Sequence, residues 1–514
     1  MIRRRFVAPR PPLLALQLAV ALVCLLALRL KWPTLYAFVV AIDHGDVLFA
    51  DFVNHYYPTV TDGLRQGAPA GGFFYPAGFA AMLSPLALVG ATAAKVLWAV
   101  VELGCLAYVA SVLVAAVVPK KPGLALLGTA LTVTSVPVLH NLKWGQVSLP
   151  ILAATGAAFL LRARSEGRGG SNGSRGSRNV PAALLGIAAG IKGYPLVFVG
   201  WFVARRDLGF VGRAAVACVV TLVLLPAIVM GPAHALFFQR VSTGAVMGAA
   251  DGVLRDFNSQ YAPAVLGRYE GGWDATSYDH RAMGELGAMA ALVLVAALVF
   301  LVARSRAPRI AERRDMLGFV LIACTVPFWL RTSWSHYFVH LPLAQTLLAG
   351  MLTERSAAAA AAASKASASA ASAATASSTS APAASSTSSC RTSARDALVL
   401  AVLVAPSVFL SNVLGLFATE GWWYYANAGS LFFANALVLL ACAGVIVDAH
   451  VRFIAGARAD ADARARADAR ARADARASAD ARASADARAS ADAGASADAG
   501  ASADAGSRGG TGAG

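Results

Sequence analysis

The chain has 514 residues, of which 57% are hydrophobic and only 14% are charged, and it carries a formal net charge of +16. A soluble domain has roughly 25% charged residues, so this composition offers too little polar surface for a water-soluble globular protein. The positive charge does not indicate nucleic-acid binding. The basic residues lie mainly between apolar runs or in the C-terminal tail, as the positive-inside rule of membrane proteins predicts for loops.

Apolar runs of nearly the length that spans a bilayer, about 20 residues of helix, recur along the chain. In chain order they are Leu13–Leu30, Lys95–Val118, Val211–Met230, Leu286–Val302, Ala397–Phe417 and Leu431–Val447. The first run follows several arginines as a signal peptide would, but it is long and lacks a small-residue cleavage site, so we interpret it as a retained span. The sequence therefore predicts an all-α, multi-spanning integral membrane protein.

Low-complexity stretches interrupt this pattern. Ser356–Ser393 is almost entirely alanine, serine and threonine, which predicts a disordered loop. Ala457–Ala505 alternates alanine with aspartate, arginine, serine or glycine and has no face to bury. We therefore expect a membrane core over residues 1–352, the disordered loop over 353–395, C-terminal spans over 396–450, and a solvated, non-catalytic tail over 451–514.

The basic residues also predict the face on which each loop lies. The arginines at the N-terminus and in the segments 162–178, 205–213 and 304–314 should be cytoplasmic, together with the alanine- and serine-rich loop and the tail. Alternate crossings then place the other polar segments on the external face: Lys31–Tyr75, His140–Gln146, Ala233–Glu285, Arg331–His336 and Glu420–Ala428.

Parts of the chain do not fit a simple alternation. Val180–Val203 lies between basic loops and contains Lys192-Gly193-Tyr194-Pro195, so we expect a hairpin of short helices with Lys192 near its outer apex. Ala77–Val89 begins on the external side and is only about half to two thirds of a span. Either it re-enters the membrane or the Lys120–Lys121 turn is external, and the sequence does not decide between these.

The first external loop is the richest in candidate catalytic groups. Its apolar residues repeat at helical spacing, which predicts an amphipathic helix on the membrane surface, bent at Pro58. These residues are Phe49, Phe52, Val53, Tyr56, Val60 and Leu64. Asp51, His55 and Asp62 fall on the opposite face. A carboxylate there is suited to act as a general base toward a substrate hydroxyl, although a solvated acidic face accounts for the same pattern.

Lys192 is a second candidate, because it interrupts a run of apolar residues and has no acidic neighbour in sequence. It either snorkels to the membrane interface or binds an anion, for which a lipid phosphate is the natural choice. The segments His140–Gln146 and Asp256–Gln260 add amide side chains on the same predicted face.

The turn Arg331–Tyr337 lies between apolar segments on that face as well. Arg331 and His336 are candidates for contacting a phosphate or a leaving group. Trp334 and Tyr337 are equally typical of the aromatic belt at a membrane interface.

Taken in order, these motifs resemble glycosyltransferase family 87, the polyprenyl-phosphate-mannose-dependent mannosyltransferases of actinobacteria. The resemblance runs from the first span to about Gly350, with weaker similarity in the last two spans. The matching motifs are Asp51-Phe52 with Tyr56-Tyr57, Gly67 with Phe73-Phe74-Tyr75-Pro76, Trp144-Gly145-Gln146, Gly186 with Gly190-Ile191-Lys192-Gly193-Tyr194-Pro195, Asn258-Ser259-Gln260, and Ser333-Trp334-Ser335-His336-Tyr337.

The resemblance implies a GT-C-type membrane glycosyltransferase fold in the plasma membrane, with the active site on the external face. It implies that a sugar, expected to be mannose, moves from a polyprenyl phosphate to a lipid or glycan acceptor. The anomeric carbon is inverted, so a β-linked donor gives an α-linkage. The sequence has no convincing phosphate-cradling glycine loop and, outside the low-complexity tail, no D-x-D pair for a metal-bound nucleotide sugar, and we expect no metal or cofactor.

The same resemblance assigns roles to individual residues. Asp51 is the expected catalytic base. Lys192, Arg331 and His336 are expected to stabilise the leaving phosphate. The other residues expected to bind donor or acceptor are His55, Tyr56, Gln146, Asn258, Gln260 and Trp334.

A polytopic transporter or lipid flippase is the alternative, because broken helices and buried polar residues are also typical of that class. Internal repeats would favour it, and the hydropathy pattern shows no such repeat. A non-enzymatic membrane scaffold would leave the external polar clusters without a role. We therefore predict a hexosyltransferase whose partners are a lipid-linked sugar, an acceptor and membrane lipids, and not nucleic acid.

Overall fold

The computed structural model describes residues 11–30, 48–119, 121–167, 175–254, 256, 258–271, 281–354, 364, 368, 394–413 and 422–504. Within these ranges the regular structure is helical and no strand occurs. Five of the described helices are long and apolar enough to cross a membrane, and a bent pair of helices brings the number to six. The predicted all-α, multi-spanning membrane fold is therefore confirmed.

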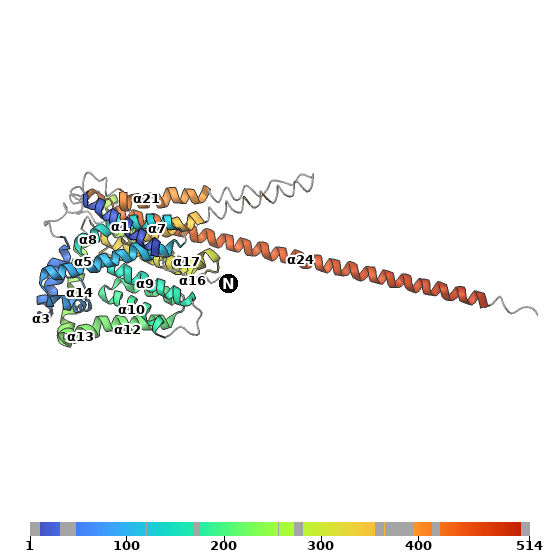
Figure 1. Ribbon diagram of the computed structural model, residues 1–514, viewed down its shortest axis with the longest axis horizontal. Coiled ribbons are helices and arrows are strands. Elements are labelled where there is room, and N and C mark those ends of the chain that lie inside the picture. The colour runs from blue at the N-terminus through green and yellow to red at the C-terminus, as the bar shows by residue number, and fades with distance from the viewer. Residues whose placement is uncertain are drawn as a thin grey trace, which may run out of the picture. The chain divides into compact units, whose positions relative to one another are not determined.

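The described part of the chain is made almost entirely of helices (Figure 1). Their bounds are α1 Pro11–Leu30, α3 Leu64–Gln66, α4 Ala77–Leu83, α5 Ala91–Tyr108, α6 Val114–Val117, α7 Pro122–Thr134, α8 Val136–Trp144, α9 Ser148–Gly167, α10 Arg175–Ile191, α11 Val199–Ala204, α12 Leu208–Val219, α13 Leu225–Met230, α14 Pro232–Leu254, α15 Ala262–Gly271, α16 Arg281–Arg304, α17 Pro308–Ala323, α18 Val326–Trp329, α21 Ala405–Val408, α23 Trp422–Asn427 and α24 Ser430–Asp504. The chain divides into two units, Met1–Val447 and Asp448–Gly514. The loop expected to be disordered, residues 353–395, lies almost entirely outside the described residues.

The arginine-rich segments gather at one end of the helices, here called the basic end. Arg162, near the end of α9, pairs with Asp207 at 2.6 Å, and Arg205 pairs with Asp315 at 2.6 Å. The C-terminal ends of α9, α11 and α16 therefore lie near one another, as the shared charge pattern predicts for one side of a membrane. Because α9 begins at Ser148, the segment around Gln146 lies at the opposite end.

The segment between these basic loops breaks where its sequence predicts. Helix α10 ends at Ile191, and a short 3₁₀ turn, Tyr194–Phe198, leads into α11. Since α10 starts at the basic end and Asp207 returns to it, the two helices form the expected hairpin, with Lys192 at the far apex.

The structure also decides the course of the short apolar segment Ala77–Leu88. Lys121 Nζ donates a hydrogen bond of 2.6 Å to Thr353 Oγ1, beside the glutamate that pairs with Arg313. Lys121 thus lies at the basic end, and Ala91–Val117 crosses the helical layer once. Ala77–Leu88 therefore starts and ends at the other end of the helices and does not cross their layer, as the re-entrant alternative expects.

Glycines bring α10 into close contact with α12, which lies beside it (Figure 1). A Cβ atom at Gly186 would collide with the carbonyl oxygen of Ala214, and one at Gly190 would lie 2.5 Å from Thr221 Cγ2. Small residues four apart are a common way for membrane helices to approach closely. The close packing holds α10, and hence the apex at Lys192, against the rest of the core.

The first-loop helix covers residues 50–66 and passes Pro58 without ending. Two π-helical turns, Phe52–Tyr56 and Thr59–Gly63, flank the proline. A proline lacks the N–H that an α-helix requires, and wider turns keep the chain helical around it. The buried side chains of this helix include Phe52, Tyr56 and Val60, while Asp62 is exposed. The predicted apolar face of the helix is thereby confirmed, but it packs against the protein's own core at Phe79 and Trp98, and its expected position on the membrane surface stays a prediction.

The tail forms a helix, because α24 runs to Asp504. From residue 451 to residue 490 every side chain is exposed. Alanine favours helix, and alternating arginine and aspartate allow ion pairs between residues four apart. The helix has no apolar face for packing.

Deleting residues 457–514 should leave membrane insertion unchanged, together with the transfer activity that the family resemblance implies. The physical reason is that this segment has no apolar side to bury. The measurement compares the truncated and full-length proteins for the amount in washed membranes and for transfer rate per molecule. A smaller amount in the membranes or a lower transfer rate for the truncated protein would show that the tail is needed for insertion or activity.

Candidate active site

A cavity of about 480 Å³ opens at the end opposite to the basic end. This volume is within the roughly 300–1,000 Å³ that is typical of small-ligand sites. The lining comes from the first-loop helix, residues 72–76, the end of α8, the apex after α10, α14, Asp256, Asn258 and residues 330–337. Of the predicted site residues, those in the lining are Asp51, His55, Gln146, Lys192, Asn258, Trp334 and His336.

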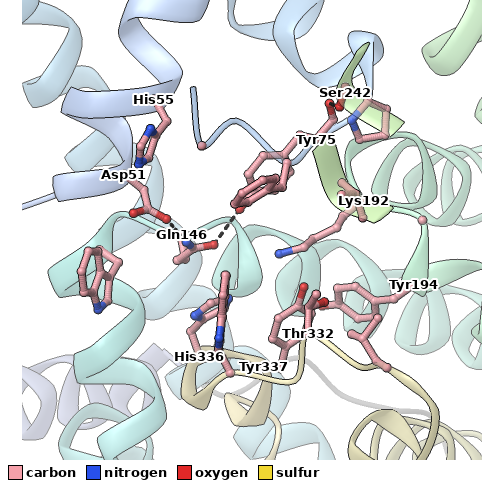
Figure 2. Close-up of a pocket in the computed structure, with 18 of the residues that line it drawn as sticks. Asp51, His55, Tyr75, Gln146, Lys192, Tyr194, Ser242, Thr332, His336 and Tyr337 are labelled. Atoms are coloured by element: carbon pink, nitrogen blue, oxygen red, sulfur yellow. Dashed lines mark hydrogen bonds between the residues drawn. The ribbon is translucent and has the colours of Figure 1, made fainter. Parts of the chain in front are cut away.

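Asp51 lies on one side of the cavity and is held by Gln146 (Figure 2). Gln146 Nε2 donates a hydrogen bond to Asp51 Oδ2, and Gln146 Oε1 accepts one of 2.6 Å from the hydroxyl of Tyr75. Tyr75 in turn accepts a hydrogen bond of 2.6 Å from Tyr56. The carboxylate is therefore oriented by a chain of side chains that ends in the buried core.

His55 lies one helical turn after Asp51, on the same side of the cavity (Figure 2). Its Nδ1 lies 2.5 Å from the carbonyl oxygen of Gly71. A carbonyl can only accept, so Nδ1 carries the proton and Nε2 is left as an acceptor in the neutral ring. Gly72 has φ of +80°, and a Cβ atom there would collide with the imidazole. The glycine therefore makes room for His55 beside Asp51.

Lys192 faces the cavity from the other side, with Tyr75 and Gln146 between it and Asp51 (Figure 2). Its Nζ lies 4.8 Å from the ring centroid of Tyr75 and 4.3 Å from that of Tyr337. Among the described residues, no carboxylate forms an ion pair with it. A half-buried ammonium held between aromatic rings is well placed to attract an anion.

His336 completes the wall next to Lys192. It is only 1% exposed, and neither ring nitrogen has a hydrogen-bond partner among the described residues. Burial, together with the nearby Lys192 ammonium and His140, holds the pKa of His336 well below its usual value. The imidazole is thus neutral at pH 7 and can both donate and accept a hydrogen bond within the cavity.

The comparison with known protein families agrees with this geometry. The model of glycosyltransferase family 87 matches residues 73–333, just over half of the chain. The chain belongs to glycosyltransferase family 87. No curated protein and no solved structure matches it significantly. Family 87 membership makes the protein a membrane glycosyltransferase, which needs a sugar donor and an acceptor, and it displaces the transporter interpretation.

The family 87 match includes Tyr75, Gln146, Lys192 and Asn258, while Asp51 lies before it. Sequence reasoning missed several residues of the family 87 cavity: Tyr75, Tyr194, Asp256 and the α14 residues Gln239, Ser242, Thr243 and Val246. Tyr75 could have been identified from the sequence, since it belongs to the Phe73–Pro76 motif that matches the family. Nothing in the sequence singles out the polar face of α14.

Three predicted binding residues lie outside the cavity lining of the family 87 protein. Tyr56 is buried behind Tyr75. Arg331 is exposed. Gln260 is buried. Its Nε2 donates a hydrogen bond of 2.8 Å to Ala426 O, and its Oε1 accepts one of 3.2 Å from the backbone N–H of Phe432. Any contact of these three with substrate stays a prediction.

Gln260 instead links the cavity to the C-terminal helices of this family 87 protein. Besides its side-chain bonds to residues 426 and 432, its backbone N–H donates a hydrogen bond of 2.7 Å to Ser333 O, next to Trp334 of the cavity wall. This backbone bond fixes the spacing between Gln260 and the turn 331–336 at Ser333. The C-terminal helices therefore brace a wall of the cavity, although they lie outside the matched range.

Replacing Gln260 with leucine should lower the melting temperature and weaken sugar transfer. The substitution removes the partner of the buried N–H of Phe432, at a cost of about 1–3 kcal/mol, while the carbonyl of Ala426 keeps its hydrogen bond from the N–H of Gly429. Melting curves of the purified protein and transfer rates at saturating donor measure the two effects. Gln66→Leu is the matched control, because Gln66 is exposed at the end of α3. An unchanged melting temperature for Gln260→Leu would contradict the bracing role.

Proposed function

We propose that this protein moves a sugar, expected to be mannose, from a polyprenyl phosphate to a hydroxyl group of a lipid or glycan acceptor. The observation that supports this most is the arrangement of charge in the cavity. The Asp51 carboxylate lies on one side, and the Lys192 ammonium faces the cavity from the other (Figure 2). A single displacement needs a base and an anion-binding group on opposite sides of the reacting carbon.

In the proposed reaction, Asp51 is the general base. The acceptor hydroxyl lies against its carboxylate, which takes the proton as the oxygen attacks the anomeric carbon. Gln146 keeps the carboxylate turned toward the cavity. The new bond joins the acceptor oxygen to the anomeric carbon, and the bond from that carbon to the phosphate oxygen breaks. Because attack and departure occur on opposite faces, the configuration inverts, and a β-linked donor gives an α-linked product.

The leaving group is a polyprenyl phosphate, whose negative charge grows as the bond breaks. Lys192 is placed to stabilise this charge through charge-assisted hydrogen bonds. The neutral His336 ring beside it can donate a further hydrogen bond to a phosphate oxygen. Trp334, which also lines the cavity, offers an apolar face for the sugar ring.

Helix α14 supports a lipid-linked donor. One face of α14 lines the cavity through Gln239, Ser242, Thr243 and Val246. Its other face exposes large apolar side chains, of which Leu236 is 74% and Met247 is 70% exposed. A helix of this kind borders the polar cavity on one side and accepts acyl or prenyl chains on the other. A lipid donor is thus able to reach the cavity without leaving the bilayer.

The distribution of basic residues supports an external active site in the plasma membrane. The described arginines Arg162 and Arg205 pair with their partners at the end of the helices opposite to the cavity. Positive loops are typically cytoplasmic. We therefore propose that the cavity faces outward and takes a lipid-linked sugar as its donor.

Donor choice tests the proposed function. The purified protein in lipid nanodiscs is given radiolabelled mannose, either on polyprenyl phosphate or on a guanosine diphosphate, with a lipid extract as acceptor. We expect label in the product only from the lipid-linked donor. Transfer from the nucleotide sugar, or from neither donor, would overturn the proposal.

A further inference from the structure

Tyr75 lies between the two sides of the cavity and joins them to the aromatic core. Its hydroxyl lies 2.6 Å from Gln146 Oε1 and 2.6 Å from the hydroxyl of Tyr56. Its ring packs against Tyr56, with centroids 5.2 Å apart, and against Phe79 at 5.0 Å. The position of the hydroxyl is therefore set by buried rings and not by a flexible loop.

The hydrogen bonds that link Tyr56, Tyr75 and Gln146 have a preferred direction. Gln146 Oε1 can only accept, so Tyr75 donates to it, and the oxygen of Tyr75 accepts from Tyr56. The amide of Gln146 is thereby turned so that its NH₂ group faces Asp51. Burial raises the pKa of Tyr75 and of Tyr56 well above the usual value, and both hydroxyls keep their protons at neutral pH.

Reversing the direction of these hydrogen bonds is unfavourable. If the amide of Gln146 turned over to accept a proton from Asp51, Tyr75 would have to donate to Tyr56 instead. The hydroxyl proton of Tyr56, which is 1% exposed, would then have no acceptor among the described residues. A buried donor without a partner is costly. The buried end of this series of hydrogen bonds therefore keeps Gln146 as a donor to Asp51. A donated hydrogen bond stabilises the charged carboxylate more than the protonated form.

We propose that Tyr75 is a positioning residue that keeps Asp51 in its charged, proton-accepting form through Gln146. This inference rests on the proposed role of Asp51 as the base. It assigns to the Tyr56–Tyr75–Gln146 chain a function that reaches beyond packing: each hydrogen bond makes the next group donate toward the carboxylate.

The first test compares tyrosine-to-phenylalanine variants in the transfer assay. Tyr75→Phe keeps the ring but removes the hydroxyl, so Gln146 is free to turn over. We expect kcat to fall about tenfold, the donor KM to stay unchanged, and the acidic limb of the pH–rate profile to move up by about one pH unit. Tyr56→Phe should move the same limb by less, since Tyr75 still donates to Gln146. Tyr57→Phe is the control, because Tyr57 donates to Val89 O away from the cavity.

A second test does not depend on the donor. Infrared difference spectroscopy follows protonation of the Asp51 carboxylate with pH, and the band is assigned as the one lost in Asp51→Asn. We expect Asp51 to take up its proton at higher pH in Tyr75→Phe than in wild type. Equal midpoints in the two proteins would overturn the inference whether or not any donor is used. A wild type inactive with polyprenyl-phosphate sugars would instead count against the proposed function alone.

Discussion

Replacing Asp51 with asparagine should slow sugar transfer at least about a hundredfold, because general-base catalysis typically contributes about 10²–10⁴-fold. Asparagine keeps the size of the side chain and can still bond to Gln146, but it cannot take a proton at neutral pH. The melting temperature and the donor KM should therefore stay close to those of wild type. Steady-state transfer rates at saturating donor and acceptor give the comparison.

Asp62→Asn is the matched control for this variant. Asp62 lies on the same helix, but it is exposed and absent from the cavity lining. If Asp51 belongs only to a solvated acidic face, the two variants should behave alike. A rate for Asp51→Asn within a few-fold of wild type would remove it from the mechanism.

Replacing Lys192 with alanine should raise the donor KM at least about tenfold, since a hydrogen bond to a charged group contributes about 1.5–3 kcal/mol. The loss arises because the phosphate of the donor no longer meets an ammonium between Tyr75 and Tyr337. A slower chemical step should accompany it, because the same phosphate gains charge as it leaves. Initial rates over a range of donor concentrations separate the two effects.

Lys192→Arg should recover part of the activity, because arginine keeps the charge but differs in shape. Lys95→Ala is the control, since Lys95 lies near the start of α5 and outside the cavity lining. A donor KM equal to that of wild type in both Lys192 variants would mean that this lysine only reaches the membrane interface.

The end of the molecule that carries the cavity was predictable from the sequence. Arginines mark the basic end, so polar segments far apart in the chain, such as those at Asp51 and His336, fall together at the other end. The break at Lys192 was also predictable, because glycine and proline follow it within three residues. These features depend on local composition, which a sequence displays directly.

The partners of individual side chains were not predictable in the same way. Tyr75 and Gln146 are 71 residues apart, and their hydrogen bond depends on how the first loop packs against the end of α8. Gln260 shows the converse case, since a polar residue in a matching motif turned inward to brace the C-terminal helices. Periodicity identifies the face of a helix on which a polar side chain lies. Whether that side chain contacts substrate or a neighbouring backbone group depends on tertiary packing.

The anomeric configuration of the product is the most direct test of a single displacement between Asp51 and Lys192. The purified wild type is given β-linked polyprenyl-phosphate mannose labelled in the sugar, and the product is digested with α-specific and β-specific mannosidases. Inversion predicts that only the α-specific enzyme releases the label. Release by the β-specific enzyme would contradict the mechanism, because retention requires two displacements and a covalent intermediate on the protein.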